Sequence, residues 1–280
     1  MHSSQIEKAA QFAALHAGPG AFVIPNPWDA GTARILQGLG FAALTTTSAG
    51  LAFALGRRDG AGAVSRDEAL ANAKAIVDAT DLPVAADLEN GYGDAPQTVA
   101  ETIVLAARTG LVGASIEDAT GDPAAPIYCF DHAVARVAAA ARAARTLDFP
   151  FVVVGRAENF LHGHPDLEDT IARLQAFEAA GADALYAPGL SDPNDIRAVC
   201  AAVTKPVNVL APVKGSTLSV ADLAALGVRR ISLGSALTRA ALGAFLKAAR
   251  EVRERGTFAF ADDAIPYAAA NDLMGGAPSP

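Results

Sequence analysis

The chain contains few cysteines, few aromatic residues and no cluster of basic residues. Cys129 and Cys200 are the only cysteines in 280 residues, too few for a disulfide framework or a structural zinc site. Such a count is consistent with a reducing compartment. Acidic residues outnumber basic ones by 30 to 22, and the formal net charge is −8. We therefore expect no nucleic-acid partner, because binding to phosphate needs clustered Lys and Arg.

Long hydrophobic runs are missing as well. No stretch approaches the roughly 18 apolar residues of a membrane span, and Glu7 and Lys8 stand where a signal peptide would have its apolar centre. These absences predict a soluble, cytoplasmic protein with no membrane partner. Hydrophobic residues nevertheless make up 51% of the chain, with only 6% aromatic. This composition suits many small-residue helices packed on a sheet.

Short apolar runs alternate along the chain with alanine-rich segments that carry charges at helical spacing. The runs predict eight strands, at 22–25, 42–47, 83–87, 113–117, 151–156, 184–188, 206–210 and 230–234. The intervening segments predict helices at 29–37, 66–79, 95–108, 133–147, 167–180, 194–202, 220–226 and 236–254.

This alternation favours a closed (β/α)8 TIM barrel in the α/β class over an open doubly wound sheet. The stretch after the first strand, IPNPWDAG (24–31), also lacks the Gly-x-Gly-x-x-Gly turn of a dinucleotide-binding fold. No linker or change of composition divides the chain, so we expect one barrel domain over 1–280. An extra N-terminal helix before residue 20 is expected to cap the bottom of the barrel, and 257–280 to form a C-terminal helical tail.

Charged residues gather where the predicted strands end, which is where barrels of this kind build active sites. The third strand ends at Asp87 and continues to Glu89, the fourth ends at Glu117 and the fifth at Arg156. Alternation along a strand places Asp87 and Glu89 on one face, toward the barrel axis. Two close carboxylates repel each other unless a cation lies between them or a proton is shared. Oxygen ligands alone select a hard ion, so the pattern predicts Mg²⁺, or else Mn²⁺.

Other interpretations of these residues stay open at this point. Asp87 and Glu89 could cap the next helix or pair with Arg156 in a structural network, although a cap explains only one acid. The fork of donors on Arg156 also suits a substrate carboxylate, with Glu158 orienting it from the same face. His162, in LHGHPD, has a spacing to His164 seen in metal sites, but its loop setting favours contact with solvent or a lid.

Four motifs together resemble the isocitrate lyase/phosphoenolpyruvate mutase superfamily. They are LGRRDG (55–60), DLENGYG (87–93), SIEDA (115–119) and GRAEN (155–159), in the order of that family and within residues 20–235. The resemblance implies a set of catalytic residues and a set of metal ligands. The catalytic residues would be Asp59, Arg156 and Glu117, and the ligands of Mg²⁺, direct or through water, Asp87, Glu89 and Glu117.

The resemblance also implies a substrate-binding set. Arg156 would bind a substrate carboxylate, and backbone groups of Thr47, Ser48 and Ala49 the same or a second anionic group. Trp28 and Asn208 would form pocket walls. Members of the family cleave or form C–C or C–P bonds next to a 2-oxo acid through a metal-stabilised enolate, without an organic cofactor. They are commonly homotetramers, so a homo-oligomer, dimer or tetramer, is expected.

Residues 119–132, ATGDPAAPIYCFDH, depart from the family pattern. The lyases carry Lys-Lys/Arg-Cys-Gly-His there, with the cysteine as acid/base, and the mutase an Asn-Ser pair. Cys129 lacks the flanking residues that would lower its pKa, so we expect it to be a packing residue.

The function expected is C–C bond cleavage or decarboxylation of an oxaloacetate-like 2-oxo acid. The alternatives are a phosphonopyruvate or other C–P bond hydrolase, a phosphoenolpyruvate mutase-like enzyme, or a catalytically weak protein that binds 2-oxo dicarboxylates. A Schiff-base mechanism is disfavoured, because no inward strand position carries a lysine.

Overall fold

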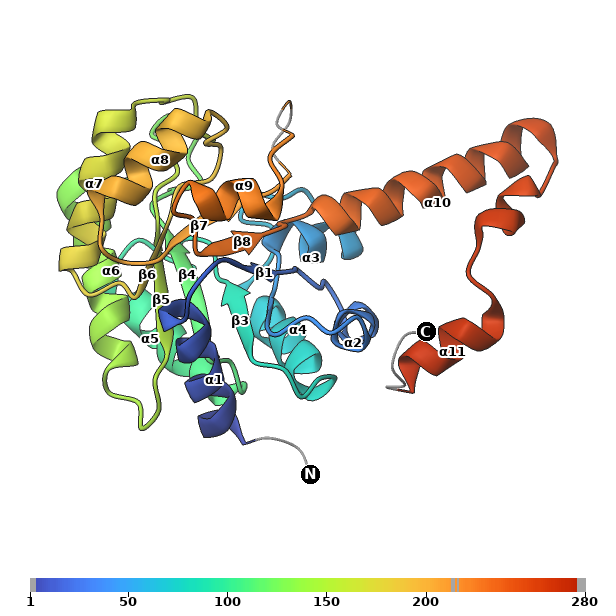
Figure 1. Ribbon diagram of the computed structural model, residues 1–280, viewed down its shortest axis with the longest axis horizontal. Helices are drawn as coiled ribbons and strands as arrows, with labels where there is room; N and C mark the ends of the chain where they lie inside the picture. Colours follow the sequence, from blue (N-terminus) through green and yellow to red (C-terminus); the bar gives the residue numbers. More distant parts are fainter. Residues whose placement is uncertain (1–3, 213–214, 216, 276–280) are drawn as a thin grey trace.

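Eight parallel strands form a single sheet in the computed structural model, which describes residues 4–212, 215 and 217–275 (Figure 1). The strand order is β1-β8-β7-β6-β5-β4-β3-β2. The backbone N–H of Thr45 donates to the carbonyl of Pro25 at 3.1 Å, which brings the two ends of the sheet together into a nearly closed barrel. The predicted (β/α)8 TIM barrel is thus confirmed. The strands are β1 (Phe22–Ile24), β2 (Leu44–Thr45), β3 (Val84–Asp87), β4 (Gly113–Glu117), β5 (Val152–Arg156), β6 (Ala184–Tyr186), β7 (Val207–Leu210) and β8 (Arg230–Ser232).

Helices follow the strands as the sequence pattern predicts, with shifts of a few residues at their ends. The helices that surround and extend the barrel are α2 (Ala30–Gly38), α3 (Ser48–Ala54), α4 (Arg66–Asp78), α5 (Pro96–Arg108), α6 (Phe130–Ala144), α7 (Leu167–Ala179), α8 (Pro193–Ala202), α9 (Val220–Ala225), α10 (Ala236–Arg255), the 3-10 helix η1 (Ala259–Asp263) and α11 (Tyr267–Met274). Helix α3 was not predicted. It starts directly after β2 because the Thr47 side chain caps it by accepting from the Gly50 N–H at 3.2 Å.

The alternation of each strand divides the apolar side chains between two cores. Val84, Ala86 and Leu88 pack outward in a cluster with residues of α4 and α5. Ala85 and Val154 lie in a separate cluster inside the barrel. Asp87 therefore shares the inward face with Ala85, as the period-2 pattern predicts.

The N-terminal helix α1 (Gln5–Ala17) closes the lower end of the barrel, as expected. A capping box between Ser4 and Glu7 begins this helix. Its Phe12 is fully buried within the interior cluster. The ring lies beside Gly113, the first residue of β4, where a Cβ atom would come within 2.8 Å of it. Glycine at this position allows the helix to pack closely against the strand.

The C-terminal segment leaves the barrel. Figure 1 shows α10 projecting away from the sheet, and the chain then returning so that α11 lies near α2. Arg34 on α2 donates to the carbonyl of Met274 at the end of α11. No helix within the described ranges is both long and apolar enough to cross a bilayer.

Candidate active site

The ends of β3, β4 and β5 bring an arginine into contact with three carboxylates. Arg156 Nη1 lies 3.3 Å from Asp87 Oδ1 and 3.0 Å from Glu117 Oε2. Arg156 Nε donates to Glu158 Oε1, so Glu158 does face inward and orients the guanidinium. These four side chains are between 2% and 17% exposed. The site is therefore largely removed from water, where charge–charge interactions are strong.

Helix α3 contributes a second set of contacts to Asp87. The backbone N–H and the hydroxyl of Ser48 donate to Asp87 Oδ2 at 3.3 and 2.9 Å. Asp59 lies close enough for the charge of Asp87 to act on it. Its pKa is raised, first by burial and then by that charge. The loop residue Asp59 thus joins the acidic group, as the resemblance implies.

The turn after β3 holds Glu89 in an uncommon backbone conformation. Glu89 and Tyr92 have φ values of 48° and 63°, in the left-handed region that side chains larger than glycine rarely adopt. Gly91, at φ 79°, makes the same turn without strain. The Glu89 carbonyl accepts from the Glu117 N–H at 3.0 Å, which ties the turn to β4. Such local strain is commonly retained where a side chain has to be aimed at a site.

Arg136 on α6 fixes the turn after β3 through hydrogen bonds to its backbone. Its side chain is 1% exposed, and its guanidinium donates to the backbone carbonyls of Asn90, Gly93 and Asp94. The guanidinium also stacks 4.2 Å from the centre of the Tyr128 ring. Arg136 could not be recognised from the sequence, because its role depends on contacts more than 40 residues away along the chain.

A buried network fixes Glu158 in turn. The Glu158 N–H donates to Asp118 Oδ1 at 2.8 Å, and Arg173 Nη1 donates to Asp118 Oδ2 at 2.9 Å. Arg173 also pairs with Asp169 at 2.7 Å. Asp118 follows Glu117 directly and its N–H donates to the Arg156 carbonyl at 3.1 Å, so this network joins the ends of β4 and β5.

Negative charge exceeds positive charge at this site. Burial, and then the charges of Asp87 and Asp59, raise the pKa of Glu89 to about 7. Burial also raises the pKa of Glu117 well above its usual value. Arg156 is the one guanidinium in contact with these acids among the described residues. An arrangement with this imbalance can accept a further cation.

The raised pKa of Glu89 predicts how the stability of the folded protein changes with pH. Its usual value is 4.5, so between about pH 4.5 and 7 the folded protein binds more protons than the unfolded chain. Without metal, stability should therefore fall as pH rises through this window, with a Glu89 contribution of up to about 3 kcal/mol. Glu89→Gln should remove that part of the slope. Glu101→Gln, at an exposed rim position, should keep it. Urea unfolding with EDTA at pH 5 and pH 7 measures the difference, and equal slopes in both variants would contradict it.

The donor set fits a hydrated magnesium ion better than a cage of carboxylates. Among residues 4–212, 215 and 217–275, no group of three or more His, Cys, Asp or Glu side chains has the geometry of a metal site. Mg²⁺ usually keeps several of its waters and takes only one or two carboxylates from the protein. The donors at this site are all oxygens and carry excess negative charge, which suits an ion that keeps several of its waters. Direct ligation by all three of Asp87, Glu89 and Glu117 is not needed.

Two cavities meet at the acidic group. The inner one has a volume of about 170 Å³ and is lined by the predicted residues Thr47, Ser48, Ala49, Asp59, Asp87, Arg156 and Asn208. This volume is below the range of drug-sized pockets and suits a small acid. Trp28 lines neither this cavity nor the outer one.

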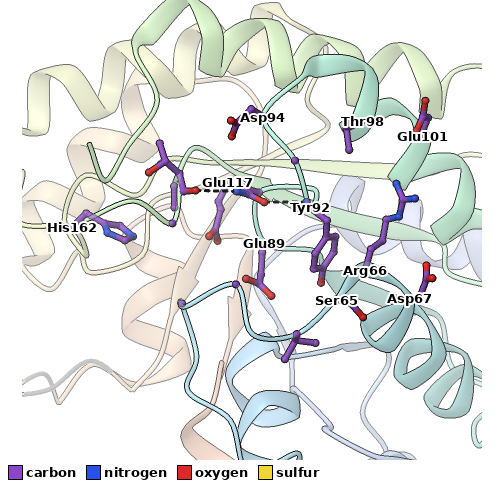
Figure 2. A pocket seen from close by; sticks show the side chains of 18 residues that line it. Ser65, Arg66, Asp67, Glu89, Tyr92, Asp94, Thr98, Glu101, Glu117 and His162 are labelled. Carbon is purple, nitrogen blue, oxygen red and sulfur yellow. Dashed lines mark hydrogen bonds between the residues drawn. The ribbon is translucent and has the colours of Figure 1, made fainter. Parts of the chain in front are cut away.

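The outer cavity has a volume of about 740 Å³ and leads from Glu89 and Glu117 toward solvent. Figure 2 shows these two carboxylates near its middle, with His162 and Arg66 at opposite ends. His162 Nε2 lies 3.4 Å from Glu158 Oε2. His162 follows Glu158 by four residues, a spacing that brings two side chains together over one helical turn. This spacing is the signal in the sequence that could have placed His162 at the site.

The loop between β4 and α6 forms one edge of the outer cavity. Ala119 pairs with Ile127 in an isolated antiparallel bridge, and Thr120 and Gly121 line the cavity. Cys129 follows as an exposed residue at the start of α6. The prediction that Cys129 is a packing residue is therefore wrong, since α6 begins at Phe130, three residues earlier than expected, and the residue before it is exposed.

Residues 12–253 match the family model of phosphoenolpyruvate phosphomutase. The chain belongs to this family. The predicted membership in the isocitrate lyase/phosphoenolpyruvate mutase superfamily is thereby confirmed, and with it the status of an enzyme of the lyase and mutase type.

Sequence relatives of this phosphomutase-family chain are found in bacteria. The uncharacterized protein Rv1998c of Mycobacterium tuberculosis H37Rv is 34% identical, over 86% of this chain and 88% of its own. Oxaloacetate decarboxylase of Chromohalobacter salexigens is 30% identical, over 90% and 87%.

Solved structures superpose closely on this chain. A crystal structure of a candidate lyase/mutase from Burkholderia cenocepacia J2315 is 56% identical, covers 98% of this chain and 99% of that one, and has a TM-score of 0.95. Oxaloacetate acetylhydrolase in complex with its product oxalate is 27% identical, with coverage of 98% and 96% and a TM-score of 0.87.

Proposed function

We propose that this enzyme is a magnesium-dependent carbon–carbon lyase acting on a small 2-oxo acid of the oxaloacetate type, by C–C bond cleavage or decarboxylation. The observation that carries the proposal is the contact of Arg156 Nη1 with both Asp87 and Glu117, at 3.3 and 3.0 Å. This contact supports the proposal because Arg156, which would bind a carboxylate, lies beside acids that would bind a cation, at one small cavity. The similarity to oxaloacetate decarboxylase and to oxaloacetate acetylhydrolase supports the substrate class.

Asp87, Glu89 and Glu117 would hold the ion, directly or through water. When bound, Mg²⁺ would act as a Lewis acid on the oxygen that gains charge as the bond breaks. Asp59 lies beside Asp87 and would accept hydrogen bonds from waters there. Glu158, fixed by Asp118, keeps the guanidinium in place.

Arg156 would bind the substrate carboxylate next to the keto group. The Ser48 N–H and hydroxyl, which already donate to Asp87, face the same cavity and would orient the anion. In decarboxylation the C–C bond electrons pass to an enolate, CO2 leaves, and a proton adds to carbon to give the 2-oxo acid product. His162, on the wall of the outer cavity and 3.4 Å from Glu158, would relay that proton from solvent.

Release of pyruvate from oxaloacetate tests the proposal. Turnover should depend on added Mg²⁺, disappear with EDTA and return when Mg²⁺ is restored. Phosphonopyruvate, tested in parallel, separates C–C from C–P cleavage. Calorimetric binding of 2-oxo dicarboxylates without turnover of any of these compounds would instead identify a binding protein.

We also propose that the enzyme is a homo-oligomer in which α10 packs against a neighbouring copy. This helix projects from the barrel and exposes Leu242, Phe245 and Leu246, with Phe245 71% exposed. Apolar side chains at helical spacing on an extended arm are typical of a contact surface.

A substitution on α10 tests the oligomer. The wild type should sediment as a dimer or tetramer of 28.4 kDa chains, and Phe245→Glu should shift it toward monomer. Glu254→Gln, on the opposite side of the helix, should leave the assembly unchanged. Analytical ultracentrifugation measures all three, and a monomeric wild type at micromolar concentration would refute the arrangement.

A further inference from the structure

Arg230 is a buried arginine whose guanidinium is only partly satisfied by the protein. It lies on the inward face of β8, is 4% exposed, and its Nε and Nη1 atoms make no hydrogen bond. No ion pair joins it to any acid in the described part of the chain. Its closest ring contact is Phe12 of α1, with the guanidinium carbon 5.8 Å from the ring centre.

The other buried arginines show what such a group normally requires. Arg136 donates to three backbone carbonyls, and Arg173 pairs with Asp118 and Asp169. Burial of a cation without such partners is strongly unfavourable. Arg230 is the exception, which indicates that its remaining partner is something other than the protein.

The positive charge of Arg230 is not removed by a lowered pKa or balanced by the titratable groups near it. Burial lowers its pKa only to about 10, so it is a cation at neutral pH. His16, which approaches from α1, is neutral there, because burial and then the charge of Arg230 lower its pKa to about 4. The carboxylates on the same cavity, Asp59 and Asp87, are associated with Ser48 and Arg156.

Arg230 also has access to the inner cavity. It lines the 170 Å³ space together with Tyr186, Asn208 and Ser232, and Arg156 lines that space as well. Asn208 Nδ2 donates to Ser232 Oγ at 3.0 Å, while Asn208 Oδ1 has no partner. The unpaired N–H groups of Arg230 are donors that an anion or ordered water would complete, whereas Asn208 Oδ1 is an acceptor that needs a donor such as water.

We propose that Arg230, beside the hydrogen-bonded side chains of Ser232 and Asn208, forms an anion-binding subsite inside the barrel that takes a carboxylate or another small anion. The anion is either a resident inorganic ion or the far carboxylate of a dicarboxylate whose first carboxylate is held by Arg156. The subsite does not depend on which bond the enzyme cleaves.

A bromide soak followed by anomalous diffraction tests for the subsite directly. Crystals of the wild-type protein soaked in sodium bromide should show an anomalous peak in contact with the Arg230 guanidinium. A second soak with bromide and malonate separates the two sources. Loss of the peak assigns the subsite to a substrate carboxylate, and a peak that persists assigns it to a resident ion. Absence of a peak in the first soak overturns the proposal.

Thermal unfolding in chloride-free buffer gives an independent measurement. Bromide or formate should raise the unfolding temperature of the wild type in a saturable way. Arg230→Met should require roughly tenfold or more anion for the same shift, since it loses charge-assisted hydrogen bonds. Arg229→Met, which removes a neighbouring arginine that donates to the carbonyls of His16 and Gly20, should respond like the wild type. An unchanged response in Arg230→Met would show that any crystal peak is an adventitious ion and would overturn the proposal.

Discussion

Asp87→Asn is expected to reduce metal-dependent turnover of oxaloacetate by roughly a hundredfold or more. The substitution keeps the size of the side chain and an acceptor for Ser48, but removes the negative charge that contacts Arg156 at 3.3 Å. Loss of a charged group that acts at the reacting centre commonly has this scale of effect. Steady-state pyruvate release at saturating Mg²⁺, for wild type and variant, measures it.

A control separates this effect from a general change in charge. Asp67→Asn removes an acid from an exposed position on the rim of the outer cavity, in the first turn of α4. It should retain turnover within about twofold, because surface charges away from special contacts have small effects. Full metal-dependent activity in Asp87→Asn would mean that the ion is held elsewhere.

Arg173→Met should destabilise the protein by about 3–5 kcal/mol, because it leaves Asp118 buried without its partner. Arg173 is 7% exposed and Asp118 1%, at a distance of 2.9 Å. Turnover should fall as well, since Asp118 also accepts from the Glu158 N–H and so positions Arg156 indirectly. Urea unfolding and steady-state kinetics together measure the two consequences.

Arg145 offers a matched control for that substitution. Arg145 pairs with Asp183 at 2.5 Å, but the arginine is 52% exposed. Arg145→Met should change stability by no more than about 1 kcal/mol, as for other surface pairs. If both variants lose the same stability, burial does not explain the importance of the Asp118 network.

The strands and the acidic group could be predicted because their signals are local. An apolar run that ends in Asp87, Glu117 or Arg156 predicts a strand with a charged residue at its C-terminal end. Alternation along the strand and the geometry of a barrel then predict that this residue faces the active site. The β2 region was predicted too long for an equally local reason. Thr47 caps α3 and so ends the extended conformation, and the Gly and Ala that follow gave no strong helical pattern.

The supporting contacts could not be predicted, because they join distant parts of the chain. Arg173 reaches Asp118 across 55 residues, and Arg136 reaches the turn after β3 across more than 40. Either arginine alone is indistinguishable from a solvated helix charge. Arg230 gave a weak signal, as it alternates with Ser232 on a short strand, but only the folded barrel shows that no acid accompanies it.

In the proposed function, the acidic group at the strand ends binds a divalent cation beside Arg156. A crystal of the protein grown with Mn²⁺ in place of Mg²⁺ and with oxalate tests it most directly, because manganese is located by its anomalous scattering. We expect one peak next to Asp87, within reach of Glu89 and Glu117 directly or through waters, and oxalate in contact with Arg156. A cluster that binds no ion under these conditions, with Arg156 still bridging Asp87 and Glu117, would contradict the account.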